Sequence, residues 1–230
     1  MTQAIPNVML FAAGFGTRMG ALTRVQPKPL IPVAGRPLID HTLDLARELG
    51  PQQIVANTHY KAEMLIDHLE PHGVRISDEQ PDILDTGGGL RHALPMLGPD
   101  PVATMNTDAI WKGPNPLRLA LDHWAPDDMD ALLVCVPISR AVGRKGGGDF
   151  AVDPQGRISR GGDRVYGGIQ ILKTDGLQHI DQSTFSLNLL WNRMLAEDRL
   201  FAVEYPGHWC DVGHPEGIQL AEELLRGRDV

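Results

Sequence analysis

The stretch that decides the fold is Leu10-Phe11-Ala12-Ala13-Gly14-Phe15-Gly16-Thr17-Arg18-Met19, followed a few residues later by Gln26-Pro27-Lys28-Pro29-Leu30. An apolar run that reads as a buried strand ends in a turn with two glycines. These glycines let the backbone curl and direct its N–H groups into a concavity that favours anions. The arginine of the first stretch and the lysine of the second add two positive charges that a chain of phosphates can bridge. The sequence therefore predicts a triphosphate-binding loop directly after a buried strand.

Two other phosphate-binding glycine loops do not fit this spacing. A dinucleotide-binding fold requires G-x-G-x-x-G and an acidic residue about 20 positions further on. Here the third glycine is Gly20, one position late, and no strand ending in a carboxylate follows. A P-loop requires G-x-x-x-x-G-K-[ST], which occurs nowhere in the chain. The remaining alternative is that the glycines only turn a loop and Lys28 is a solvated surface side chain.

The arrangement G-x-G-T-R-x-x-x-L-T-x-x-x-P-K-P-L, residues 14–30, closely resembles the signature of the sugar-1-phosphate nucleotidylyltransferases. These enzymes join a nucleoside triphosphate to a sugar 1-phosphate, so the resemblance implies these two substrates and Mg²⁺ as cofactor. It implies catalytic roles for Arg18 and Lys28. The residues of this region that it assigns to nucleotide binding are Ala12, Ala13, Gly14, Gly16, Thr17 and Lys28.

The resemblance continues in order through nearly the whole chain. Among the subfamilies, the chain looks most similar to the N-acetylmuramate α-1-phosphate uridylyltransferases of bacterial cell-wall recycling, which favours UTP and N-acetylmuramate 1-phosphate as substrates. Mannose-1-phosphate guanylyltransferases share most of the same strings and are the alternative. One departure is Gly20–Thr23, where relatives usually carry a basic residue and a proline, so weaker triphosphate binding is expected. The further matching strings are T-G-G-G at 86–89, N-x-D at 106–108, G-D-F at 148–150, G-G-I at 167–169 and G-H-W-x-D-V-G at 207–213.

Length and composition bound the function. A chain of 230 residues, 42% of them hydrophobic, can bury one sizeable core, and a single domain is expected with a nucleotide-binding half at 1–137 and a sugar-binding half at 138–230. A net charge of −8 argues against nucleic-acid and anionic membrane partners. Cys135 and Cys210 are far apart in the sequence, which fits a reducing cytoplasm. No signal peptide or long apolar stretch is present, so a soluble protein is expected, as a monomer or a small homo-oligomer.

Alternating strand-like and helix-like segments in the first half predict β-α-β units. Such units give a doubly wound, Rossmann-like, mainly parallel sheet that binds ligands at the carboxyl ends of its strands. The resemblance implies the GT-A-like version of this fold. After 137 the pattern changes to a smaller, more antiparallel region on the sugar side. The expected strands are 8–12, 54–56, 74–76, 102–105, 130–137, 150–152, 157–159, 165–172 and 201–203, and the expected helices are 38–49, 61–69, 86–94, 184–197 and 215–226.

Two aspartates are the candidate metal ligands and catalytic carboxylates. Mg²⁺ prefers one or two carboxylates together with phosphate oxygens and water. Asp108 follows a buried strand, and Asp211 precedes a glycine turn, as the two metal-binding aspartates of the resembled family do. For either one alone, a turn or helix-capping role is the alternative. Asn106, beside Asp108, is a candidate for ribose or phosphate oxygens.

The remaining candidates concern the base and the sugar. Gly87 and Gly88 begin a helix where side chains would block a planar base, and in the resembled family this segment lies along the nucleobase, often with an upstream residue such as Glu79 or Gln80. Helix capping by flexible glycines is the alternative. Two further residues are assigned to the sugar, although the first can also be a strand-edge charge: Asp149 and Gly168.

A different class of function is a sensor of this fold that binds nucleotide sugars without catalysis. Loss of a metal carboxylate or of the lysine would indicate it, and the chain keeps all four charged residues: Arg18, Lys28, Asp108 and Asp211. The nine histidines show no metal-binding spacing. The sequence therefore favours the enzyme.

Overall fold

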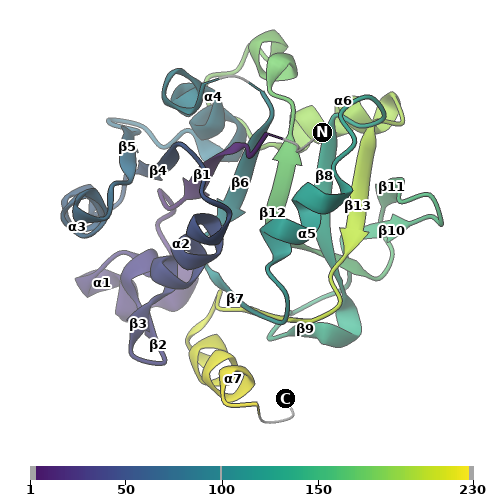
Figure 1. Cartoon of the computed structure of the whole chain (residues 1–230). Coiled ribbons are helices and arrows are strands. Elements are labelled where there is room, and N and C mark those ends of the chain that lie inside the picture. The colour runs from purple at the N-terminus through teal and green to yellow at the C-terminus, as the bar shows by residue number, and fades with distance from the viewer. Residues whose placement is uncertain (1–3, 99, 228–230) are drawn as a thin grey trace.

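In the computed structural model, which describes residues 4–98 and 100–227, a mainly parallel sheet lies at the centre of the molecule (Figure 1). Strand β1 (Asn7–Phe11) pairs in parallel with both β4 (Ile54–Thr58) and β6 (Val102–Asn106), and β4 pairs in parallel with β5 (Arg75–Asp78). The order β6-β1-β4-β5 brings the carboxyl ends of these strands to one edge. The predicted doubly wound sheet is confirmed.

Antiparallel strands extend this sheet on the side of β6. Strand β12 (Arg164–Leu172) lies antiparallel between β6 and β8 (Ala131–Pro137), while β13 (Leu200–Glu204) adds to β8 in parallel. The hairpin of β10 (Phe150–Val152) and β11 (Ile158–Arg160) pairs with the start of β12 and forms the outer edge of the sheet. The predicted antiparallel region is therefore present.

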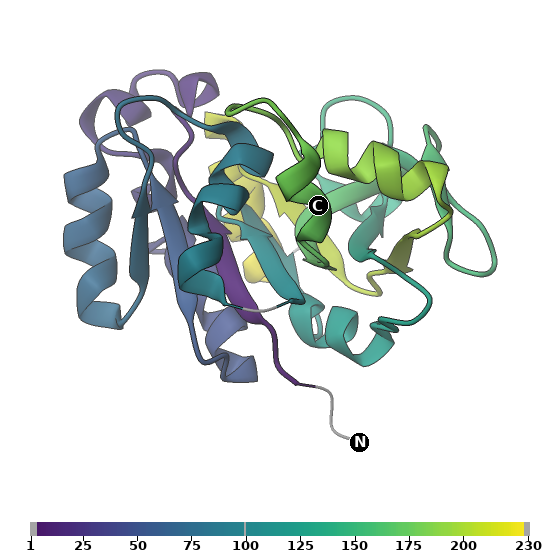
Figure 2. The same ribbon diagram turned by 90° about the horizontal axis from the view of Figure 1, so that it is seen from above.

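Helices cover both faces of the sheet because successive strand residues point to opposite sides. Val8 and Leu10 of β1 enter one core, whereas Met9 between them enters the other. Figures 1 and 2 show the helices on the two sides. The first core is covered by α2 (Leu38–Leu49), α3 (Ala62–Leu69) and α5 (Pro116–His123), and the second by α4 (Asp85–Leu97) and α6 (Asn188–Ala196).

A second, three-stranded sheet lies next to the carboxyl-end edge. It consists of β7 (Ala109–Lys112), β14 (His208–Asp211) and β9 (Ala141–Val142), and α7 (Pro215–Leu225) packs against it (Figure 1). A third apolar cluster joins this layer to the segments that follow β1. Its buried residues are Met19, Ile31, Val33, Leu38, Ile110, Cys210, Val212, Ala221 and Leu224. Through this cluster, segments from both ends of the chain are held in fixed positions around one site.

Short elements complete the segment between β1 and α2. The helix α1 (Leu22–Val25) and the two-stranded ribbon of β2 (Pro32–Val33) and β3 (Arg36–Pro37) are separated by a 3₁₀ turn at Lys28–Leu30. Another 3₁₀ turn lies at Thr17–Met19. In the described ranges, no helix has the length and apolar character needed to cross a bilayer.

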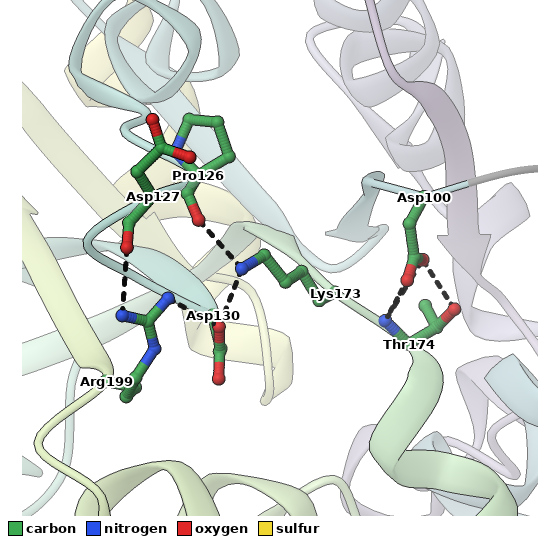
Figure 3. A network of polar contacts seen from close by, with 7 residues as sticks. All are labelled: Asp100, Pro126, Asp127, Asp130, Lys173, Thr174 and Arg199. Carbon is green, nitrogen blue, oxygen red and sulfur yellow. Dashed lines mark hydrogen bonds and ion pairs between the residues drawn. The ribbon is translucent and has the colours of Figure 1, made fainter.

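A polar network connects segments at the end of the sheet that is opposite to the carboxyl ends of β1 and β6 (Figure 3). Asp130 accepts hydrogen bonds from Lys173 Nζ and Arg199 Nη2, each at 2.9 Å, and Asp100 accepts from the backbone N–H of Thr174 at 3.0 Å. Burial raises the pKa of Asp130, but the hydrogen bonds and charges of Arg199 and Lys173 outweigh it and leave this pKa below its ordinary value. These groups lie at the amino ends of β6, β8 and β13, so the network is structural and remote from the strand ends that bind ligands.

One expected helix needs correction, and three elements were not expected. The helix expected at 184–197 begins only at Asn188, because the preceding segment is engaged with α4: Leu187 N donates to Thr86 Oγ1 at 3.0 Å. The elements β7, α5 and β14 are present where no helix or strand was expected.

Candidate active site

A cavity of about 320 Å³ opens at the carboxyl ends of β1 and β6. It brings together segments that are about 200 residues apart in the chain, from the loop after β1 to Gly213. The predicted residues that line it are Ala12, Ala13, Gly14, Gly16, Thr17, Arg18, Lys28, Asn106 and Asp108. The structure therefore collects most of the predicted nucleotide-binding residues around one space.

The loop after β1 has the backbone shape that the glycines predict. Gly16 has φ +62°, and a Cβ there would lie 2.8 Å from Cβ of Lys28 and 2.9 Å from Cγ2 of Thr23. Any side chain at this position would therefore push the lysine segment away. In the part of the chain that the structure describes, the N–H groups from Ala13 to Gly16 have no acceptor within the protein. They remain available to an anion in the cavity.

A buried polar chain holds the start of this loop. The N–H of Ala12 donates to Asn57 Oδ1 at 2.7 Å, and Asn57 Nδ2 donates to Glu79 Oε1 at 2.7 Å. The other oxygen of Glu79 accepts from the N–H of Leu84 at 2.8 Å, and the side chain is almost fully buried. Glu79, which the sequence suggested for base contact, thus joins the ends of three strands to the start of α4. Gln80, the other suggestion, donates to the carbonyl of His59.

Asn57 was missed in the sequence. The only available signal was an amide side chain near the end of an expected strand, at the edge where parallel sheets bind ligands. In the structure this amide is 3% exposed and lines the cavity. Its hydrogen bond from the N–H of Ala12 shows that it orients the start of the loop after β1.

The two predicted metal aspartates are neighbours because β7 and β14 pair. Asp108 lies directly before β7, and the antiparallel register sets Ala109 opposite Asp211. The N–H of Val212 also donates to the carbonyl of Asp108 at 3.0 Å. A short strand pair thus brings together two residues about 100 positions apart in the sequence.

Two cations neutralise this pair in part. Lys28 Nζ lies 2.7 Å from Asp108 Oδ2, and the lysine side chain is only 10% exposed. A Cβ at Gly213 would lie 2.8 Å from Asp211 Oδ1 and 3.0 Å from Arg18 Nη1, so the glycine leaves room for both groups. All four predicted catalytic residues therefore surround one place at the cavity edge.

The electrostatics of the pair fit a bound cation. Burial raises the pKa of Asp211, the charge of Asp108 raises it further, and Lys28 and Arg18 oppose the shift without reversing it. Two carboxylates that repel each other would bind a divalent cation favourably. Among the described residues, no cluster of three or more histidine, cysteine or acidic side chains is arranged to hold a metal. Ligand phosphates and water would have to supply the remaining oxygens, which suits Mg²⁺.

The glycines at the start of α4 have partners within the protein. The N–H groups of Gly87 and Gly88 donate to the carbonyl of Phe185 at 2.8 and 3.1 Å. The residues of α4 that line the cavity are Asp85 and Thr86. Base contact by the two glycines stays a prediction, and their hydrogen bonds give them a second role, which is to fasten α4 to the segment before α6.

A second cavity, of about 360 Å³, adjoins the first and shares four lining residues with it: Phe11, Asp85, Thr86 and Asn106. Asp149 lines this second cavity. One of its oxygens accepts from Arg144 Nη2 at 2.7 Å and the other from the N–H of Tyr166 at 2.9 Å. The carboxylate thus orders the glycine-rich loop at 143–148 against β12.

Gly168, the other residue predicted for the sugar, is outside the lining of both cavities. It has φ +91°, and a Cβ there would lie 2.8 Å from the side chain of Asn106. The glycine therefore gives space to Asn106, which borders both cavities. Its contact with a sugar stays a prediction.

Comparison with known proteins identifies the family to which the chain belongs. Residues 8–208 match the family described as "MobA-like NTP transferase domain". The chain is 36% identical to the N-acetylmuramate alpha-1-phosphate uridylyltransferase of Caulobacter vibrioides, covering 98% of this chain and 99% of that protein. It is 26% identical to a probable mannose-1-phosphate guanylyltransferase 1 of Oryza sativa subsp. japonica, covering 96% of this chain and 66% of that protein.

Solved structures agree on the fold. HddC from Yersinia pseudotuberculosis complexed with GMP-PN superposes with a TM-score of 0.74 at 21% identity, covering 96% of this chain and 99% of that one. A putative glucose-1-phosphate thymidylyltransferase from Bacillus anthracis gives a TM-score of 0.78 at 18% identity, with 97% and 96% coverage. At such identities the likeness shows a common fold.

Proposed function

The chain belongs to the family of MobA-like NTP transferase domains, and from this premise we propose that it transfers a uridylyl group from UTP to N-acetylmuramate 1-phosphate, with Mg²⁺, to give the UDP-sugar and pyrophosphate. The sugar and the base follow the similarity to the protein of Caulobacter vibrioides over nearly the full length of both chains. The observation that carries the proposal is the grouping of Arg18, Lys28, Asp108 and Asp211 at a cavity that continues into a second one.

Nucleotidyl transfer demands charge neutralisation and in-line positioning of two phosphates. The loop after β1 offers N–H groups from Ala13 to Gly16, and Arg18 and Lys28 offer full charges. Asp108 and Asp211 would hold Mg²⁺, which would supply Lewis-acid stabilisation of the charge on the phosphate oxygens. In the free protein, Lys28 is paired with Asp108. When the triphosphate binds, a phosphate would be the alternative partner of the lysine.

The two adjoining cavities suit two substrates that must meet. The first has the phosphate loop and would take the triphosphate, and the second would take the sugar. Asn106, on their shared border, is placed to contact the phosphates or the ribose where the substrates meet. This division supports a nucleotide-binding half at 1–137 and a sugar-binding half at 138–230 within one domain. Asp211 belongs to the second half but would contribute a metal ligand to the nucleotide site of the first half.

We place the enzyme in the cytoplasm, in cell-wall recycling. Cys135 and Cys210 are buried free thiols, as a reducing compartment favours. The net charge of −8 disfavours nucleic-acid and anionic membrane partners. Its proposed partners are therefore its two substrates and, at most, further copies of itself in a small homo-oligomer.

A grid of nucleoside triphosphates against sugar 1-phosphates tests the function. We expect pyrophosphate release to be fastest with UTP and N-acetylmuramate 1-phosphate. Fastest release with GTP and mannose 1-phosphate would favour the second candidate, which the similarity to the rice protein supports. Tight binding of a nucleotide sugar without pyrophosphate release from any pair would contradict an enzyme and indicate a sensor.

Replacing Asp149 is expected to affect the sugar side only. Asp149→Ala removes a carboxylate from the second cavity and releases both Arg144 and the N–H of Tyr166. We expect a higher KM for the sugar 1-phosphate and a loss in kcat/KM of about 10- to 100-fold, the range for lost charged hydrogen bonds of about 1–3 kcal/mol. Triphosphate affinity, measured by calorimetric titration, should change little.

The matched control for this variant is Asp163→Ala, which removes an exposed carboxylate from the same region of the chain. It should leave both KM values unchanged. If Asp149→Ala weakens triphosphate binding as much as sugar binding, the loop at 143–148 closes over the nucleotide and the division into two halves is wrong.

A further inference from the structure

Arg160 is a cation fixed in the wall of the second cavity. Its guanidinium carbon lies 5.1 Å from the ring centre of Phe150 and 5.9 Å from that of Trp191, while Nη2 donates to Asn192 Oδ1 at 2.8 Å. Stacking on two aromatic rings and a hydrogen bond to an amide hold the planar group in position. The guanidinium is thus oriented before any ligand binds.

The charge of Arg160 has no ion-pair partner in the described part of the chain. The other guanidinium of the cavity, Arg144, is paired with Asp149, whose two oxygens are both engaged. Burial lowers the pKa of Arg160, and the charge of Asp149 opposes this shift from a distance. Asp85, at the border with the first cavity, accepts from the N–H of Thr86. One cation in the wall therefore remains without a contacting carboxylate.

The place of Arg160 in the sheet separates it from the phosphates. Strand β11 lies at one edge of the sheet, and β10 and β12 lie between it and β6, which leads to Asp108. At about 4.8 Å per strand, β11 runs roughly 14 Å from β6. Arg160 lines the second cavity and not the first, so a sugar bound there would turn toward it a part that is remote from the reacting phosphates.

We propose that Arg160 is a specificity-determining residue that binds a carboxylate carried by the sugar of the sugar 1-phosphate. This inference rests on the proposed function, because it assigns a side chain to the feature that distinguishes N-acetylmuramate from N-acetylglucosamine, the carboxylate of a lactyl ether. A guanidinium presents parallel N–H donors that match the two oxygens of a carboxylate. A neutral hexose offers no such partner, so Arg160 selects for the acidic sugar.

The test compares two sugar 1-phosphates that differ in this group, N-acetylmuramate 1-phosphate and N-acetylglucosamine 1-phosphate, in pyrophosphate release with UTP. For the unmodified protein, kcat/KM should favour the acidic sugar by about 10- to 100-fold, as expected for a charge-assisted hydrogen bond. Arg160→Gln should bring this ratio close to one through a higher KM for the acidic sugar, with the KM for UTP unchanged. Arg160→Lys, which keeps the charge without the paired donors, should give an intermediate ratio.

The matched control is Arg157→Gln. Arg157 precedes β11, and its guanidinium also stacks on an aromatic ring, that of Phe201, but it lies outside the second cavity. This variant should keep the full preference for the acidic sugar. An equal loss for both sugars in Arg160→Gln, or an unchanged ratio, would overturn the proposal and leave Arg160 as a packing residue. Absence of pyrophosphate release from either sugar in the unmodified protein would instead contradict the proposed function.

Discussion

Asp108→Asn and Asp211→Asn are each expected to lower turnover by about 100-fold or more, because each removes one of the two carboxylates that would hold the metal and compensate charge at the reacting phosphates. The two side chains are neighbours through the pairing of β7 with β14. Since the described residues provide no third acidic, histidine or cysteine ligand in a cluster with them, neither loss can be compensated from within the described protein. Pyrophosphate release at saturating substrates measures the effect.

Measurements of stability to chemical denaturation should distinguish a metal-binding role of the two aspartates from a structural role. The pKa of Asp211 is raised by burial and by Asp108, so its ionised form is unfavourable in the free protein. Asp211→Asn removes that unfavourable charge, and the midpoint of chemical denaturation should stay the same or rise while activity falls. Asp108→Asn instead takes the partner from Lys28 and should lower the midpoint.

The control is Asp122→Asn on α5, an exposed aspartate that should leave both readings unchanged. Chelator should abolish activity of the unmodified protein, and added Mg²⁺ should restore it. Full activity of either active-site variant, or undiminished turnover in excess chelator, would contradict the assignment of the metal to this pair.

The central sheet was predictable because its strands carry local signals. The segment around Met9 is a continuous apolar run that ends in glycines, as is typical of a strand buried on both faces. Apolar spacing likewise predicted α2, which ends at Gly50 in the left-handed conformation. Such patterns depend on neighbours in sequence, so one sequence is enough to show them.

The long-range contacts that complete the site leave no comparable pattern in the sequence. Strands β7 and β14 have four residues each, and their pairing joins segments about 100 positions apart. The glycines of α4 predicted a close approach, but not that the carbonyl of Phe185 would make it. Similarly, the sequence suggested Glu79 for base contact but not its hydrogen bonds with Asn57 and Leu84. Residue type and strand ends predicted which residues gather at the first cavity, whereas long-range packing decided which of their donors and acceptors are free.

The loss of Lys28 is expected to have the second large effect, and to lower kcat more than it raises the KM for the triphosphate. The ammonium is already held at the edge of the first cavity, 2.7 Å from Asp108, because Lys28 begins a 3₁₀ turn directly after Pro27 and packs closely against Gly16. A preorganised charge needs little rearrangement when negative charge develops on the phosphate, so it stabilises the transition state more than bound substrate. We expect Lys28→Ala to lower kcat by about 100-fold, in the range for removal of one such group.

The Lys28 variant has a second consequence that can be measured without substrate. Without the lysine, Asp108 and Asp211 face each other with less compensation, so the pKa of Asp211 should rise further than burial and Asp108 already raise it. We also expect the variant to bind Mg²⁺ more tightly than the unmodified free protein does at neutral pH, because the metal ion no longer competes with Lys28 for Asp108. Arg118→Ala, which removes one exposed positive charge from α5, is the control and should change neither kcat nor metal binding. If Lys28→Ala raises the KM for the triphosphate with kcat unchanged, Lys28 contributes to ground-state binding only, and charge stabilisation during transfer must come from Arg18 and the metal.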